Sequence, residues 1–159
     1  MAEQIMLDMI KKRKMQDKIT VESAATSTEE IGNRMDRRAR EQLAKFGIDT
    51  GNHFAVQLKR EDAEKYDWIV CMDGNNMRNC YSILQGDAIY VTPSDVRTIF
   101  ERDPASPISF NGMVKPRVCK LMDFTGNPRD VADPWYTGDF AQAYRDIVLG
   151  CTSILSLVQ

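Results

Sequence analysis

A continuous apolar run near the middle of the chain sets the tightest limit on its fold. The run extends from Trp68 to Met72 without a charged residue, as is typical of a strand that is buried on both faces of a parallel sheet. Neighbouring parallel strands are joined by crossovers, which are usually helices. Asp73 follows the run directly and suits the cap of a helix that we expect to reach about Leu84. The region therefore predicts an α/β domain.

Other segments continue this alternation of strands and helices. Apolar residues at helical spacing predict helices, and short apolar or β-branched runs predict strands. We expect helices at residues 2–16, 36–46, 60–66, 93–100 and 139–158, strands at 19–25, 88–91 and 118–122, a short extended segment at 54–58, and loops at 26–33, 104–116 and 123–138. Thr92 suits the cap of helix 93–100, and Gly47 suits the position after helix 36–46. The order indicates one domain, residues 1–159, with a parallel sheet.

Charge and hydropathy argue against several functions. The net charge of −2 gives no overall basic field for nucleic acid or an anionic membrane. The basic run Lys11–Lys14 falls at the end of a predicted helix, where cations favour the helix dipole; a partner-binding patch is the alternative. No apolar stretch is long enough to span a membrane, and residues 1–20 lack the apolar core of a signal peptide. We therefore expect a cytoplasmic protein that binds neither membrane nor nucleic acid.

The cysteines and the single histidine do not suggest a metal site. Cys71, Cys80, Cys119 and Cys151 lie far apart, in or beside apolar segments and without the spacing of metal ligands. We expect reduced and mostly buried thiols. His53 has no second histidine or cysteine close to it in the sequence.

Near the C-terminus, Asp133 opens the stretch Asp133-Pro134-Trp135-Tyr136. An Asp-Pro pair commonly starts an ordinary turn, but an acid followed by two aromatic rings also resembles the proton-donating loop of a small phosphatase. Together with this stretch, other segments resemble the low-molecular-weight protein-tyrosine phosphatases over roughly residues 1–87 and 118–159. In order along the chain they are Met1-Ala2-Glu3, Val21 to Ser27, Ile69 to Asp73 with Asn76 and Arg78, Leu121 to Phe124, Asp130 to Tyr136 and Gly138 to Cys151.

The resemblance implies a fold and a reaction. The fold would be a three-layer α/β/α arrangement around a small parallel sheet. The reaction would be hydrolysis of phosphotyrosine in proteins, or of small aryl phosphates, through a cysteinyl-phosphate and without a metal or organic cofactor. Asp133 would protonate the leaving oxygen as general acid, and Trp135 and Tyr136 would contact the substrate ring.

Further residues would lie near the phosphate in such a fold. Asp73 most simply caps its helix, with a supporting role at the phosphate loop as the alternative. Asn76 and Arg78 would make contacts on the surface of that helix or with a loop. Ser23 and Thr26 follow a predicted strand, at the end where α/β sites gather.

The chain departs from the family at the nucleophile. The family's first strand and the Cys-x5-Arg phosphate loop that follows it are missing. In that motif the arginine comes six residues after the cysteine, and the residues at this position after the four cysteines are Met77, Gly86, Thr125 and Leu157. We therefore expect the true start to lie upstream of Met1, and no activity from the chain as written.

A second departure is an insertion at about residues 88–117, which has no counterpart in the family. Its segment 88–91 could supply a strand in place of the missing central one. Three alternatives to the truncated enzyme stay open. One is a non-catalytic binding module that uses Trp135 and Tyr136, and another is an unfolded gene remnant. The third is an arsenate reductase on the same fold, which the acid loop and the absence of paired reducing cysteines disfavour. The sequence does not indicate an oligomeric state.

Overall fold

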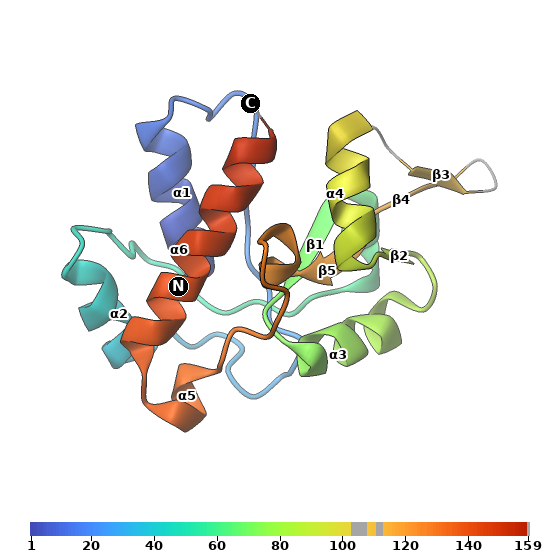
Figure 1. The fold of residues 1–159 in the computed structure, drawn as a ribbon. Coiled ribbons are helices and arrows are strands. Elements are labelled where there is room, and N and C mark those ends of the chain that lie inside the picture. The colour runs from blue at the N-terminus through green and yellow to red at the C-terminus, as the bar shows by residue number, and fades with distance from the viewer. Residues whose placement is uncertain (103–107, 111–112, 159) are drawn as a thin grey trace.

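The structure is a computed structural model that describes residues 1–102, 108–110 and 113–158. Its helices are α1 (Ala2–Lys12), α2 (Arg37–Ala44), α3 (Gly74–Leu84), α4 (Pro93–Arg102), α5 (Pro134–Thr137) and α6 (Phe140–Leu157), and its 3₁₀ turns are η1 (Arg60–Glu64) and η2 (Leu121–Phe124). Its strands are β1 (Trp68–Cys71), β2 (Ile89–Tyr90), β3 (Ile108–Phe110), β4 (Met113–Lys115) and β5 (Arg117–Lys120). In Figure 1, α1, α2 and α6 form one group, and α3 and α4 lie beside the sheet.

A small parallel sheet confirms the predicted α/β class. Its strand order is β1-β5-β2, and β5 pairs in parallel with both neighbours, with Val118 opposite Ile69 on one side and Tyr90 on the other. Val118 and Cys119 of this central strand are fully buried. The strand predicted from Trp68 is present, but most of it is only half-buried. We expected burial on both faces, and the difference arises because β1 lies at the edge of this sheet.

Apolar side chains of α1, α2 and α6 form the largest part of the core. Helix α1 packs along α6, and the core between the helices and η2 contains the buried side chains Ile5, Ile10, Leu43, Met122, Ile147 and Leu155. Full burial of a side chain of this size contributes about 1.5–3 kcal/mol to folding. The apolar faces that predicted the first and last helices are therefore the faces that these helices bury in this core.

One glycine sets how closely α6 approaches η2. A Cβ atom added at Gly150 would lie 2.4 Å from Cγ of Leu121, which is far inside van der Waals contact. The helix can lie this close only because residue 150 has no side chain.

Residues 19–25 do not form the predicted strand. Within the described residues they make a single parallel bridge, in which the Ala25 N–H donates to the Val56 carbonyl at 2.7 Å and the Leu58 N–H donates to the Ala25 carbonyl at 2.9 Å. A strand needs a continuous ladder, and in the part of the chain that the structure describes this segment pairs with a neighbouring extended segment only at Ala25, while the Ile19 N–H donates to the Met15 carbonyl at 3.1 Å. Its sequence favours an extended chain but cannot supply the neighbour.

The insertion contains more structure than predicted. Residues 108–110 and 113–115 pair as the antiparallel strands β3 and β4, whereas we expected a loop over 104–116, of which 104–107, 111 and 112 lie outside the described residues. The printed sequence has a hairpin signal there, because short apolar runs flank Asn111-Gly112. The figure shows this hairpin extending away from the rest of the molecule (Figure 1).

The strand predicted at 88–91 forms as β2, but it does not replace a central strand. It pairs with β5 on the side opposite β1, and so it extends the sheet at its far edge. The hypothesis that this segment fills the gap beside residues 19–25 is therefore wrong. The position of β2 follows from the order of the elements, since β2 comes directly after α3 and Pro116 connects the insertion to β5.

The helices at 36–46, 74–84, 93–100 and 139–158 are confirmed, with shifts of a few residues. Three other elements end earlier or differ in type. Helix 2–16 ends at Lys12 because Lys14 has a φ of 56°, and η1 is a 3₁₀ turn. Strand 118–122 ends at Lys120, whose N–H donates to the Asp123 carboxylate at 2.8 Å and starts η2. No helix of the described residues is long and apolar enough to cross a membrane.

We predict that Gly150→Ala destabilises the protein by about 1–3 kcal/mol, because overpacking forces the Leu121 side chain or the α6 backbone to move. Urea unfolding followed by circular dichroism measures the change. Gly126→Ala is the matched control, since a Cβ there meets nothing within 4 Å. Equal stability of the two variants would contradict the close packing of α6 on η2.

Candidate active site

Asp133 opens the short surface helix α5. Its carboxylate Oδ1 accepts a hydrogen bond from the Trp135 N–H at 2.9 Å, Pro134 occupies the first turn, and Gly138 ends the helix with a φ of 72°. The first turn of a helix tolerates proline, because the N–H that proline lacks would have no partner there. Glycine adopts a positive φ without strain. The local sequence therefore fixes this turn, and Asp133 with Pro134 starts it, as an Asp-Pro pair commonly does.

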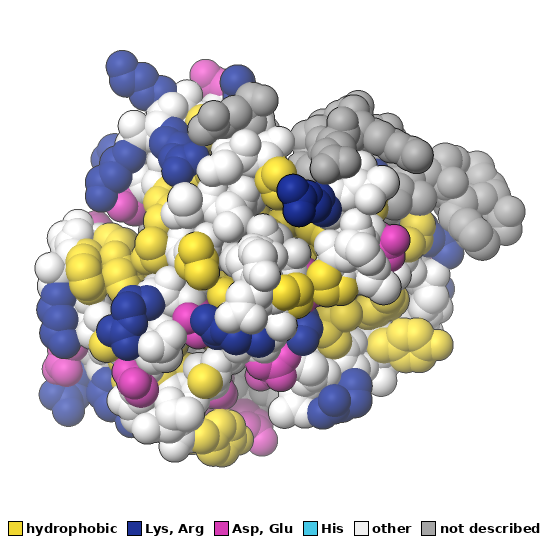
Figure 2. All heavy atoms as spheres, in the orientation of Figure 1, with side chains coloured by type: hydrophobic (Ala, Val, Ile, Leu, Met, Phe, Trp, Pro, Cys, Tyr) yellow, Lys and Arg dark blue, Asp and Glu magenta, His cyan; other side chains and the backbone are white. Residues whose placement is uncertain are grey.

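The three residues predicted for the acid and the aromatic rim lie together on this turn. Asp133 is exposed, and the side chains of Trp135 and Tyr136 are 61% and 85% exposed. Figure 2 shows a hydrophobic side chain on the surface over α5, at the lower edge of the view. Because the cap uses Oδ1, Oδ2 of the exposed carboxylate is left for a further hydrogen bond.

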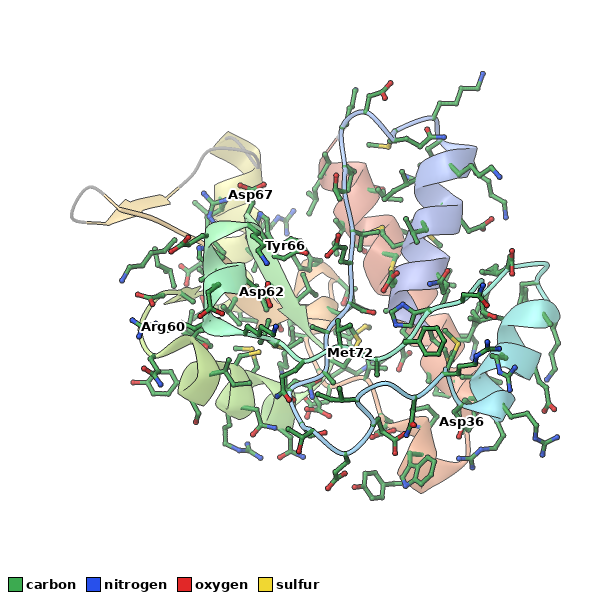
Figure 3. All side chains as sticks on the ribbon, turned by 180° about the vertical axis from the view of Figure 1, so that it is seen from behind. Asp36, Arg60, Asp62, Tyr66, Asp67 and Met72 are labelled. Carbon is green, nitrogen blue, oxygen red and sulfur yellow. The ribbon has the colours of Figure 1, made fainter. Side chains whose placement is uncertain are left out.

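Arg38 of α2 holds the Trp135 ring. Its guanidinium carbon lies 5.3 Å from the Trp135 ring centroid and 4.8 Å from that of Phe140, and contacts of this kind contribute about 0.5–1 kcal/mol at exposed sites. The guanidinium pairs with Asp36 at 3.2 Å, and Asp36 also caps α2 through the Arg38 N–H. In Figure 3, Asp36 lies at the end of α2 that faces α5. Asp36 and Arg38 thus begin α2 and also orient the Trp135 ring.

An ion pair anchors residues 129–136, called the acid loop from here on, to α6. Nη1 and Nη2 of Arg129 each donate to the Asp146 carboxylate at 2.6 Å, and Gln142 Nε2 donates to it at 2.8 Å. Asp146 is buried, and the bonds from Arg129 are the main reason that its pKa is lowered. A bidentate pair restricts orientation as well as distance. The backbone just before Asp133 is therefore fixed to the helix.

Two more contacts join the loop to the ends of the strands. The Val131 N–H donates to the Met72 carbonyl at 2.9 Å, and Met72 lies near the centre of the molecule in Figure 3. Lys120 pairs with Asp130 at 2.9 Å and, with a bond from the Gly74 backbone, lowers the pKa of Asp130. The loop therefore lies at the carboxyl ends of β1 and β5, where α/β proteins place their sites.

Asp73 caps α3 as predicted. It accepts from the Asn76 N–H at 2.7 Å, and the Asn76 side-chain oxygen accepts from the Met72 N–H at 3.1 Å. Arg78 donates to Asn75 within the same helix. Asp73 and Asn76 thus fix the strand-to-helix turn next to the acid loop, whereas Arg78 makes a contact on the surface of α3.

Ser23 and Thr26 connect other parts of the molecule. Thr26 accepts a hydrogen bond from Asn79 of α3 at 3.2 Å. Ser23 donates to Glu3 of α1 and lies 3.4 Å from Nε2 of His53. Neither contact involves residues 130–136. Over the described ranges, no group of three His, Cys, Asp or Glu side chains could hold a metal ion.

All four cysteines are buried, as predicted. Burial raises the pKa of Cys119, and it raises the pKa of Cys151 to about 12, so neither is an activated nucleophile. The sulfurs of Cys71 and Cys80 lie 3.5 Å apart. The expected absence of paired reducing cysteines stays a prediction, because the two neighbouring thiols are both free.

Comparison with known proteins identifies the family. The family model described as low molecular weight phosphotyrosine protein phosphatase matches residues 1–106. The chain belongs to this family. It is 26% identical to the low molecular weight protein-tyrosine-phosphatase YfkJ of Bacillus subtilis over 159 residues, covering 100% of this chain and 86% of the relative. A fission yeast (Schizosaccharomyces pombe) phosphatase is 30% identical, with 93% of this chain and 81% of the relative covered.

Other relatives match a shorter part. The low molecular weight phosphotyrosine protein phosphatase of chicken (Gallus gallus) is 41% identical over 78 residues, and the match spans about half of each protein, 49% in both. Among solved structures, the crystal structure of YfkJ has a TM-score of 0.75 at 25% identity, covering 98% of this chain and 82% of that one. The structure of Primo-1 has a TM-score of 0.70 at 28% identity, with 98% and 86% covered. The fold of this phosphatase family is thus confirmed.

Sequence reasoning missed the residues that hold the acid loop. Arg38 and the Arg129–Asp146 pair were not singled out, because their partners are distant along the chain and no local pattern marks them. For Arg38 the only available signal was its position two residues after the helix cap Asp36.

We predict that Arg129→Met lowers the free energy of unfolding by about 1–3 kcal/mol at neutral pH, because Asp146 stays buried without its main partner. Arg145→Met is the control, since it removes an exposed bond to Gln142 and the smallest of the charge effects on Asp146, and it should change stability by less than about 0.5 kcal/mol. Urea unfolding measures both.

The pH dependence of this effect follows from the lowered pKa of Asp146. Its pairing stabilises the folded state above the unfolded pKa of about 4, and the contribution is lost as the pH falls toward the folded pKa. The difference between the parent chain and Arg129→Met should therefore shrink from about pH 5 downward. A difference that stays constant with pH would contradict an ionic role for this pair.

Proposed function

We propose that this chain carries the general acid and the substrate-binding rim of a protein-tyrosine phosphatase. The observation that carries the proposal is the exposed turn that combines Asp133 with Trp135 and Tyr136, on a loop whose base is fixed by the Arg129–Asp146 pair. An acid that must protonate a leaving oxygen needs both exposure and a fixed position. The turn has both.

In the proposed reaction, phosphotyrosine or another aryl phosphate is hydrolysed through a cysteinyl-phosphate without a metal or organic cofactor. Asp133 donates its proton to the phenolate oxygen as the P–O bond breaks, and later accepts a proton from the water that attacks the phosphoenzyme. Trp135 and Tyr136 pack against the substrate ring. The attack itself requires a thiolate at a phosphate-binding loop with an arginine.

None of the 159 residues provides that nucleophile, since no cysteine is followed at the required spacing by arginine and the four thiols are buried. We propose that the chain alone does not turn over substrate, and that turnover requires a strand and Cys-x5-Arg loop joined ahead of Met1.

A non-catalytic binding module is the second candidate, favoured by the exposure of the rings of Trp135 and Tyr136. The same proposal includes one domain over residues 1–159 and a cytoplasmic location, which the four free thiols support.

The test compares the 159-residue chain with the same chain preceded by an apolar strand and a Cys-x5-Arg-Ser-Pro loop. We expect no hydrolysis of phenyl phosphate by the first and clear hydrolysis by the second. Turnover by the unextended chain, or none by a folded extended chain, would refute the catalytic proposal. If the extended chain is inactive while the parent chain binds a phosphotyrosine peptide through Trp135, the binding module is the better account.

In the extended chain, we predict that Asp133→Asn lowers kcat by about 10²–10⁴-fold. Asparagine caps helices as well as aspartate does, so α5 should persist. The loss should be larger for phenyl phosphate than for p-nitrophenyl phosphate, because the more basic phenolate has the greater need of a proton. Asp139→Asn is the control, since Asp139 is an exposed aspartate that caps α6. An equal loss for both substrates would argue against acid catalysis by Asp133.

A further inference from the structure

Two buried thiols meet where β1 packs on α3. Cys71 is the last residue of β1, and Cys80 lies on the face of α3 that covers the strand; they are 4% and 1% exposed. Their sulfurs are 3.5 Å apart. The cap at Asp73 begins α3 directly after the strand, so the geometry of one strand-to-helix turn brings the two residues together. A disulfide has a sulfur–sulfur bond of about 2.05 Å, so the sulfurs must approach by roughly 1.5 Å.

The contact is chemically asymmetric. Either sulfur can donate in this contact; with the Cys71 thiol as the donor, the hydrogen bond lowers the pKa of Cys80 and raises that of Cys71. The thiolate is the form that reacts with oxidants. Cys80 is therefore the first thiol to react, and Cys71 is in place as the resolving thiol.

The two remaining cysteines provide an internal comparison. Cys119 is fully buried in β5 and Cys151 is buried in α6, and burial raises the pKa of both. Of the four cysteines, all of which lie in the described residues, the structure brings only Cys71 and Cys80 within sulfur contact of each other.

We propose that Cys71 and Cys80 are a redox pair that forms an intramolecular disulfide with a peroxide as oxidant. The Cys80 thiolate attacks one peroxide oxygen, the O–O bond breaks, and hydroxide leaves and is protonated to water, which gives a sulfenic acid. The Cys71 sulfur, losing its proton, then attacks the Cys80 sulfur, the S–O bond breaks, and a second water leaves. Two thiols are oxidised by two electrons in all, and one peroxide is reduced to two waters.

The disulfide would covalently join β1 to α3 beside the turn that holds Met72 and Asn76. Since both sulfurs are buried, the oxidant reaches them when α3 moves locally away from the strand. The proposal does not depend on phosphatase activity, because it concerns only these two elements.

The test treats the reduced 159-residue chain with hydrogen peroxide, alkylates the remaining thiols under denaturing conditions and digests the product with trypsin without reduction. Arg78 lies between the two cysteines, so the disulfide would link the peptides 66–78 and 79–97. We expect this linked pair, with the mass of two hydrogens lost, and alkylated Cys119 and Cys151. Four alkylated thiols, or a disulfide through Cys119 or Cys151, would overturn the proposal.

Two variants test the order of reaction. Cys71→Ala should leave a sulfenic acid on Cys80 that dimedone traps, whereas Cys80→Ala should leave Cys71 unmodified. Trapping on Cys71 rather than Cys80 would overturn the assigned roles. Cys119→Ala combined with Cys151→Ala is the matched control and should form the linked peptides to the same extent as the parent chain. The mass of the parent chain's own peptides decides the central claim even if a variant fails to fold.

Discussion

The parallel pairing of β1 with β5 is the interaction on which the rest of the molecule depends. Four residue pairs, from Trp68–Arg117 to Cys71–Lys120, set the register. Because the strands are parallel, their carboxyl ends lie at the same edge. The start of α3, the turn η2 and the base of the acid loop all leave from that edge, so the contacts of Val131 with Met72 and of Lys120 with Asp130 depend on this one ladder.

The acid loop combines a fixed base with an exposed end. At the base, a bidentate ion pair, a bond to the end of β1 and a buried Val131 hold the backbone. At the end, the Trp135 ring lies against the Arg38 guanidinium, and Tyr136 is almost fully exposed. Such a division would suit the proposed function, in which the rings of Trp135 and Tyr136 contact the substrate while the carboxylate of Asp133 stays in a fixed position.

Strong local signals made much of the fold predictable. The strand from Trp68, the cap at Asp73 and the long amphipathic face of α6 each depend on neighbours in sequence, and all three are confirmed. The strand predicted at residues 19–25 does not form, because a strand needs a paired neighbour and the local sequence does not show whether one is present. The contacts of Arg129 with Asp146, and of Cys71 with Cys80, were not predictable, since each joins separate elements. The proposed acid Asp133 and the aromatic residues beside it could be singled out because they lie within one short motif, and their catalytic roles stay a prediction.

The absence of a side chain at Gly150 has a consequence for how this sequence can change. Leu121 occupies the space that any larger residue at position 150 would need, so the two positions form one volume that their side chains share. A substitution that enlarges residue 150 becomes acceptable only with a smaller residue at 121, and the reverse exchange would leave a void. A change of side-chain volume at either position alone therefore lowers stability, and a compensating change at the other position reduces that loss.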